Sequence, residues 1–388
     1  MLRTSFTARR AGVALATTLF MIVVIGTIIA GALFSTSLEQ RSASSQVYTG
    51  RALAAAEYGQ NAVLIDWDRG RAWTMAKGDT LIRQYNLAEG AIATAVVTKL
   101  NTTTFLVTSD GQAGATRYTR SRRATSTLLT LDIPQLRVPA AFTGRGASSI
   151  GGSSITSGAD ANPTGWDCPS AGPTVAGIAT PDSAISYSGS QYQVIGDPPV
   201  DRDPAAGDTS TFFDLGGTSY AELAATGGAK VFNVPVSTSY SINGINPVVS
   251  GGTCMTGDAK NWGDPWRLAP AGPCEGYMPI IHAAGGGTFS ISGAGGGGRA
   301  QGILLVDGDL SISGNMEFHG LILVRGKISI SGTGFKVFGG MMAANMNGGT
   351  NSIAGNSVLQ FSRCALMTVF AQRAYPKPTK ERAWADMF

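Results

Sequence analysis

The residues with the clearest potential for chemistry are the carboxylates of one acidic loop. Asp197, Asp201 and Asp203 lie within a few positions of each other, and Asp208 and Asp214 follow soon after. Several carboxylates on one loop suit Ca²⁺, which takes about six to eight oxygen ligands. The spacing does not match an EF-hand loop, because neither its Gly nor its closing Glu falls in place. We therefore expect solvated loop charge, with calcium left open as an alternative.

A second group of acids lies in the C-terminal third. Asp307, Asp309 and Glu317 are the only acids from Gly286 to Phe361. Polysaccharide-cleaving enzymes use clustered carboxylates, and Asp307 and Asp309 are alternate residues that would share one face of a strand. A corner turn at the intervening Gly explains them equally well. No Ser-His-Asp or Cys-His grouping is visible, so we expect no enzymatic activity.

The cysteines are compatible with two disulfides. Cys168, Cys254, Cys274 and Cys364 are even in number, and three pairings are possible. Only Cys254 and Cys274 are close in sequence, so that pair is favoured, with free structural thiols as the alternative. There is no Cys-x-x-Cys and the chain has two histidines, so no zinc site is expected.

A short repeat in the C-terminal third predicts the strands that position these residues. Ser-Ile-Ser-Gly occurs at 290–293, 311–314 and 329–332, and 352–355 echoes it, at a period of roughly 18–23 residues. That is the scale of one solenoid coil. Short apolar strands punctuated by Gly predict a right-handed parallel β-helix that buries Ile, Leu and Val inside. The similar segment 148–158 is a candidate for an earlier coil or strand of the same stack.

The composition favours an exported β-rich protein. The 388 residues carry a formal charge of +4, with 14% charged residues and 52 glycines. An average globular protein has about 25% charged residues and about 7% Gly. Three of the positive charges are in the first ten residues, so the remainder is close to neutral and shows no nucleic-acid footprint.

The N-terminal segment predicts a membrane anchor. No charged residue occurs from Ala11 to Leu38, which is long enough to cross the hydrocarbon core. Arg3, Arg9 and Arg10 precede it, so we expect a cytoplasmic N-terminus and an exported remainder. A cleavable signal peptide has a shorter apolar core. Here the helical pattern continues without Pro to about residue 64, which predicts one long helix.

The segment after this helix predicts a small sheet. We expect a short helix near 80–85, and then an antiparallel meander over 91–132, where Val- and Thr-rich runs alternate with turn residues. The meander would pack on the second half of the long helix.

The N-terminal region resembles that of PilX-type minor pilins, the assembly proteins of type IV pili. The resemblance is carried by the runs 9–15, 39–41 and 54–59, which read RRAGVAL, EQR and AAAEYG, and which include Glu39, Arg41 and Glu57. It implies cleavage by a prepilin peptidase after Gly12, with a mature start at Val13. Most pilins have Glu at the fifth mature position, where this chain has Thr17. That departure is similar to PilX-like proteins and to K-type minor pseudopilins of type II secretion, which bind calcium. The repeats resemble the β-helical C-terminal region of some PilX-like proteins and, more loosely, bactofilin-type stacks.

These patterns predict an α+β, mainly β fold. The expected parts are a leader (1–12), a transmembrane and amphipathic helix (13–65), an antiparallel β unit (66–135), first β-helix strands (136–165), an irregular Cys-containing insertion (166–285), β-helix repeats (286–365) and a C-terminal cap or tail (366–388).

The function implied is that of a minor pilin-like structural protein in type IV pilus assembly, at the tip or as a priming subunit, with adhesion as an added role. Its partners would be other pilin subunits, the inner membrane before assembly, and a surface receptor or glycan, but no nucleic acid. It would cross the inner membrane once and later become periplasmic or extracellular. Two alternatives stay open: an anchored envelope β-helix protein that binds or cleaves glycans, and a type II secretion pseudopilin. No cofactor is expected apart from the open case of calcium.

Overall fold

The computed structural model describes residues 11–67, 72, 75–101, 103–114, 120–132, 137–166, 168, 170–181, 184–268, 270–293, 297–372, 374–379 and 385–387. The chain forms two compact units. Unit 1 comprises 1–66, 77–129 and 378–388, and unit 2 comprises 67–76 and 130–377. Most of the predicted leader lies outside the described residues.

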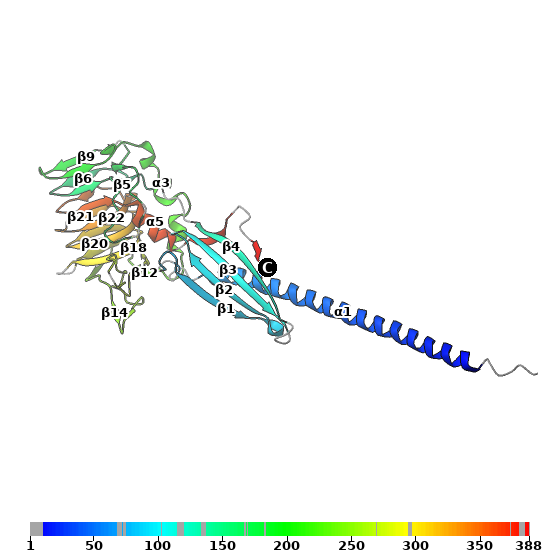
Figure 1. Ribbon diagram of the computed structural model, residues 1–388. Helices are drawn as coiled ribbons and strands as arrows, with labels where there is room; N and C mark the ends of the chain where they lie inside the picture. The colour runs from blue at the N-terminus through cyan, green and yellow to red at the C-terminus, as the bar shows by residue number, and fades with distance from the viewer. Residues whose placement is uncertain are drawn as a thin grey trace, which may run out of the picture. The chain divides into compact units, whose positions relative to one another are not determined.

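Unit 1 is a long helix with a small antiparallel sheet (Figure 1). Within this unit the sheet has the order β1-β2-β3-β4, with β26 also on β4. The bounds are α1 Ala11–Ile65, β1 Thr80–Asn86, η1 Ala88–Gly90, β2 Ile92–Lys99, β3 Thr104–Ala113, β4 Ser121–Asp132, β25 Tyr375–Pro378 and β26 Ala385–Met387. The helix and the meander are as predicted.

The predicted short helix at 80–85 is wrong, because this segment is strand β1. Its residues pair with β2 in an antiparallel register that runs from Thr80 opposite Thr98 to Asn86 opposite Ile92. The pairing satisfies the backbone groups of β1 along one edge, and this tertiary gain outweighs the local preference of a short segment.

The second half of α1 packs on β2 and β3 through small residues. Alternate residues of β3 are buried, and Ala52, Ala55 and Ala56 of α1 are at most 2% exposed. A Cβ added at Gly111 of β3 would overlap the backbone of Ala52 and Ala56. Glycine at this position therefore lets the strand approach the helix backbone directly.

Unit 2 is a stack of parallel strands in two sheets (Figure 1). The seven-stranded sheet has the order β13-β17-β19-β21-β23-β6-β9, and the eleven-stranded sheet runs β10-β7-β24-β22-β20-β18-β16-β12 with β5, β8 and β11 attached. The first sheet contains β13 Ser239–Asn243, β17 Thr288–Ser292, β19 Asp309–Ser313, β21 Ile328–Ile330, β23 Asn351–Ile353, β6 Ser148–Gly151 and β9 Ile185–Ser188. The second contains β5 Ala140–Gly144, β7 Ile155–Ser157, β8 Ala176–Ala179, β10 Gln193–Ile195, β11 Val200–Asp201, β12 Lys230–Asn233, β16 Ile280–Ala284, β18 Gly298–Val306, β20 Met316–Val324, β22 Lys336–Ala343 and β24 Val358–Phe361.

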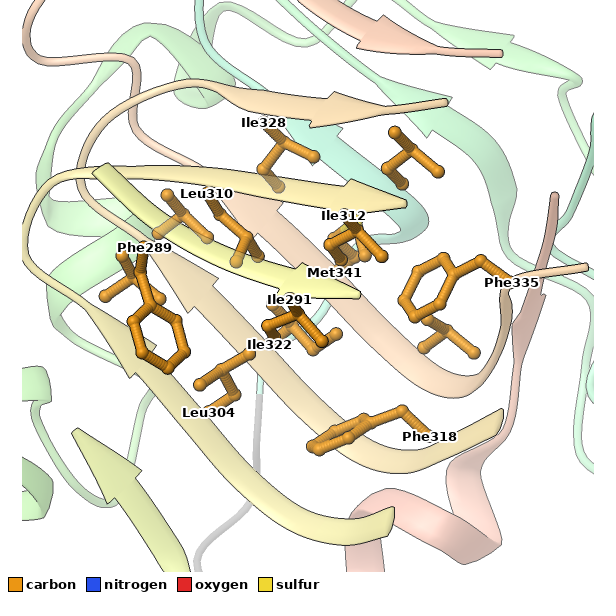
Figure 2. Packing of buried hydrophobic residues seen from close by; sticks show 14 of the residues in the cluster. Phe289, Ile291, Leu304, Leu310, Ile312, Phe318, Ile322, Ile328, Phe335 and Met341 are labelled. Carbon is orange, nitrogen blue, oxygen red and sulfur yellow. The ribbon is translucent and has the colours of Figure 1, made fainter. Parts of the chain in front are cut away.

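The Ser-Ile-Ser repeats stack in register. In the seven-stranded sheet the central isoleucines Ile291, Ile312 and Ile330 lie opposite one another and are at most 2% exposed. They form the core with residues such as Phe289, Leu310 and Phe318 (Figure 2). The serine before each Ile points the other way. The outward column consists of Ser241, Ser290, Ser311, Ser329, Ser352, Ser149 and Ser186.

Three glycines form a corner of the stack. Gly302, Gly320 and Gly339 are paired in register in the middle of β18, β20 and β22. Their φ angles are +124°, +136° and +143°, a region that other residues rarely adopt. A Cβ at Gly302, Gly320 or Gly339 would overlap the carbonyl of Pro279, Gly302 or Gly320, respectively, so the corner admits only glycine.

The stack also has an apolar face on its outside, which the sequence did not predict. Ile303, Leu305, Leu321 and Leu323 form a second buried cluster. It is covered by α5 Arg363–Ala371 and by the short helices α3 Ser210–Phe213 and α4 Tyr220–Ala224, which follow the turn η2 Pro204–Gly207. Alternate residues of one apolar strand therefore serve two cores.

The boundaries of the insertion and the tail differ from the prediction. Segment 166–285 is irregular only in part, because β8 to β11 extend the stack at one end and β12 and β13 at the other. In the described part of the tail, α5 packs on the flank of the stack, and β26 pairs with β4 of the antiparallel sheet. Segment 148–158 is part of the stack, since β6 pairs with β23 and β7 with β24.

Both disulfides lie in unit 2. Cys254 pairs with Cys274, the pair that the sequence favours, and β15 Thr253–Cys254 forms a small hairpin with β14 Val249–Ser250. Cys168 pairs with Cys364 at the start of α5. The second bridge joins Cys168, which precedes β8 in the chain, to α5, the helix that packs on the stack.

Candidate functional site

The first half of α1 is a continuous uncovered apolar surface. Five consecutive side chains, from Leu19 to Val23, are each between 54% and 69% exposed. Successive helical residues point about 100° apart, so the helix is apolar and uncovered on every side. A helix that is hydrophobic all round requires apolar surroundings.

Hydroxyl groups in this segment are satisfied by the helix itself. Thr18 donates to the Leu15 carbonyl at 2.9 Å, Thr27 to Val24 at 2.8 Å, and Ser37 to Phe34 at 2.8 Å. A hydroxyl in hydrocarbon is costly unless it is hydrogen-bonded, and these three have a partner in their own helix. The segment is therefore suited to a lipid or protein environment without a water partner.

By length and composition α1 can cross a membrane. Among the described residues it is the one helix that meets this criterion, and none of its most apolar window is buried. Signal sequences near an N-terminus meet the same criterion.

The predicted pilin-type residues all lie along α1. Gly12 and Val13 are in its first turn. Glu39 and Arg41 follow the apolar run, and Glu57 lies on the half that packs on the sheet; these three side chains are exposed. The cleavage after Gly12 stays a prediction.

The acids of the predicted loop do not converge into a metal site. Within the described chain no three His, Cys, Asp or Glu side chains are grouped so as to hold a metal ion. Asp203 accepts a hydrogen bond from the Ala205 N–H at 2.9 Å, and Asp214 accepts one from the Gly216 N–H at 3.0 Å. Both line a pocket of about 350 Å³ together with Arg137. The calcium hypothesis therefore has no set of ligands to support it in the described chain.

Asp307 is held by a cluster on the covered flank. It accepts a hydrogen bond from Tyr220 at 2.8 Å and one from the Gly285 N–H at 3.2 Å. Nε2 of His282 lies 3.3 Å away, although poorly aligned for a hydrogen bond, and Arg325 is 3.9 Å away. Burial raises the pKa of Asp307, but His282, Tyr220 and Gly285 outweigh it and lower this pKa to about 2. The carboxylate is therefore ionised and joins α4 to the stack.

A second acid–histidine pair lies on another face of the stack. Nε2 of His319 is 2.6 Å from a carboxylate oxygen of Glu317, and its ring is covered by Trp166 at 5.3 Å and Phe338 at 4.8 Å. Burial lowers the pKa of His319, and its hydrogen bond lowers the pKa of Glu317. A neutral imidazole that donates to a carboxylate could act as a base, but this one is only 3% exposed. The pair therefore secures the loop at Trp166.

The sequence analysis singled out Asp307 and Glu317 but did not pair either acid with one of the two histidines. Glu317 and His319 are two residues apart on one strand and so share a face, a signal that alternation alone supplies. His282 and Asp307 are not alternate residues; they meet because β16 and β18 are neighbours, with His282 opposite Leu305. Only the register of the coils reveals that pair.

The chain matches no protein-family model. No curated protein is similar to it either. Among solved structures, the crystal structure of the competence-associated pilin ComZ from Thermus thermophilus aligns with a TM-score of 0.28 at 12% identity, over 88% of this chain and 97% of that chain. A likeness this weak identifies neither a family nor a function.

Proposed function

We propose that this chain is a minor pilin-like structural protein that takes part in type IV pilus assembly. One observation carries the proposal: α1 is divided into a half that packs on its own sheet and a half that is apolar on every side and uncovered. A helix used first as a membrane anchor and then as a packing element in a fibre needs both halves.

The size of the uncovered apolar surface supports the proposed use of α1 as an anchor and a packing element. A dozen large apolar side chains from Leu15 to Leu38 are exposed. At about 1.5–3 kcal/mol for each, leaving them in water would cost roughly 20–35 kcal/mol. Cover by lipid, by other helices, or by each in turn would recover much of this transfer free energy.

The orientation in the membrane and the position in the pilus are proposed from the sequence. Arg3, Arg9 and Arg10 before the apolar run favour a cytoplasmic N-terminus and a single crossing of the inner membrane. We propose a PilX-like position at the tip or as a priming subunit, because unit 2 is large for a repeating subunit and Thr17 replaces the usual Glu. Its partners would be other pilin subunits, with adhesion as an added role.

The proposed role is structural rather than catalytic. Two acids of the stack support a structural role. The Asp307 carboxylate accepts hydrogen bonds from Tyr220 and from the Gly285 N–H, and the Glu317 carboxylate is hydrogen-bonded to the buried His319.

The mature N-terminus and the location of the native chain test the proposal. Mass spectrometry of sheared surface fibres is expected to find a chain that begins at Val13. Gly12→Val should leave the leader attached and remove the chain from fibres. The matched control Gly26→Val makes the same change within the apolar run, where a Cβ has open space, and should be processed normally.

An intact leader on a chain found only in membranes would overturn the proposal. The better account would then be an anchored envelope protein whose stack faces the outside. A cleaved chain that stays in the envelope with a secretion machine would indicate a pseudopilin instead.

A further inference from the structure

We propose that the outer face of the seven-stranded sheet binds an extended, neutral polysaccharide. This serine face is defined by the outward column that begins at Ser241, passes through Ser311 and Ser329, and ends at Ser186. The proposal does not depend on pilus assembly.

The register makes the serine face a straight row. Each of the seven strands contributes one serine at the same position. Figure 1 shows β9, β6 and β21 in this order along the stack, and β23 pairs with both β6 and β21. Neighbouring strands lie about 4.8 Å apart, so the row is roughly 30 Å long. The isoleucines next to the serines fill the core, which fixes the serines outward.

The serine face is almost without charge. Within the bounds of its seven strands, all of which are described, Asp309 is the one charged residue, and Lys327 lies directly before β21. The Asp309 carboxylate accepts a hydrogen bond from the Lys327 N–H at 3.1 Å, so these two opposite charges adjoin at one margin of the face and leave it without net charge. A soluble surface normally intersperses charges of both signs. An uncharged row of hydroxyls suits a neutral ligand and disfavours nucleic acids and polyanionic sugars.

The spacing of the hydroxyls suits a repeating ligand. At about 4.8 Å they are too far apart to bond to one another, since O–H···O bonds are about 2.5–3.0 Å long. Within the described chain the side-chain oxygens of Ser311 and Ser329 have no protein partner. A hydroxyl is both donor and acceptor, so an oxygen between two neighbours can bond to both. An extended β-linked polysaccharide presents one hydroxylated ring at about each such step.

A second copy of the chain fits the serine face less well. The strands contribute between one and three outward residues each, so the strip covers at most roughly 400 Å². A stable protein–protein interface buries about 800 Å² per partner. A narrow, flat row is long enough for a sugar chain but too small to hold a dimer.

Co-sedimentation of the full chain in detergent micelles tests the proposal. We expect retention on microcrystalline cellulose or on chitin, which are insoluble, neutral and β-linked. Cross-linked dextran, which is α-linked, and heparin beads, which are anionic, should not retain the chain.

Variants at the centre of the row identify the surface. Ser329→Lys places a long charged side chain there and should weaken retention at least tenfold. Thr333→Lys introduces the same side chain on the same coil but at an exposed bend outside the column, and should bind as the wild type. Ser311→Val suits a strand and removes one hydroxyl, so it should weaken retention several-fold even if Ser329→Lys does not fold. Ser329→Thr keeps the hydroxyl and should retain binding.

Two results would overturn the proposal: no retention on either neutral polymer, or equal retention of folded Ser329→Lys and wild type. If the chain is not retained but lowers the freezing point of water below its melting point, the serine row orders water instead. A chain with an intact leader that binds cellulose or chitin would contradict the pilus role and leave this inference standing.

Discussion

The phenolic oxygen of Tyr220 donates a hydrogen bond of 2.8 Å to Oδ1 of Asp307, across 87 residues of sequence. Tyr220 belongs to α4, whose first turn is closed by a capping box of Ser219 and Glu222. Asp307 follows β18 directly. This bond therefore ties a helix of the irregular region to the stack.

Removal of this phenol should destabilise unit 2. Tyr220→Phe leaves Asp307 short of one donor, and an incompletely satisfied buried carboxylate costs about 1–3 kcal/mol. The thermal midpoint of the full chain in detergent should fall by several degrees. Tyr240→Phe is the matched control, because the Tyr240 ring stacks on Phe289, and should change little. Equal midpoints for both variants would contradict the role of Tyr220.

The same carboxylate should make stability depend on acid pH. The pKa of Asp307 is lowered to about 2 in the folded chain, against about 3.9 in an unfolded one. Its contribution is thus complete above about pH 4 and is lost as the pH falls toward 2. Asp307→Asn should flatten the fall of the midpoint over this range, whereas Asp208→Asn, in an exposed loop, should not. An unchanged slope for Asp307→Asn would refute the assignment.

The contact of α1 with β3 should be sensitive to one methyl group. Gly111→Ala would push the strand from the backbone of Ala52, and overpacking of this kind costs about 1–3 kcal/mol. Hydrogen exchange of the β2 and β3 amides should become faster. Gly50→Ala has open space on α1 and should slow it, because Ala favours a helix by about 1 kcal/mol. The contact is wrongly assigned if both variants behave alike.

The glycine corner should tolerate no side chain. Gly320→Ala requires a φ of +136° and meets the carbonyl of Gly302. Positive φ alone costs about 1–2 kcal/mol, and the overlap adds to it, so we expect a large drop in the midpoint or loss of folded protein. Gly227→Ala, which has open space, should be neutral. Normal yield and midpoint for Gly320→Ala would contradict this account.

The two disulfides should contribute unequally. Cys168 and Cys364 are 196 residues apart, and Cys254 and Cys274 are 20 apart. Loop-closure entropy predicts about 5 kcal/mol for the first bridge and about 3 kcal/mol for the second. Denaturant midpoints of the double variants Cys168→Ser/Cys364→Ser and Cys254→Ser/Cys274→Ser compare them. A larger loss from the second pair would show that native contacts, not chain entropy, decide the ranking.

The parts of this fold that depend on local periodicity can be predicted from the sequence. An uncharged run from Ala11 predicts the helix, alternation predicts the meander, and Ser-Ile-Ser-Gly predicts both the inward Ile and the outward Ser of each coil. These signals are local because side-chain direction follows from the period of the backbone.

The features that depend on the register between distant coils are visible only in the folded chain. It placed β8 to β13 on the ends of the stack, made 80–86 a strand against β2, and brought His282 of one coil to Asp307 of the next. It also divided the run from Ile303 to Val306 between two cores, because α5 and α4 cover one side. Pairing between coils joins residues far apart in sequence, and no local pattern encodes which coil lies beside which.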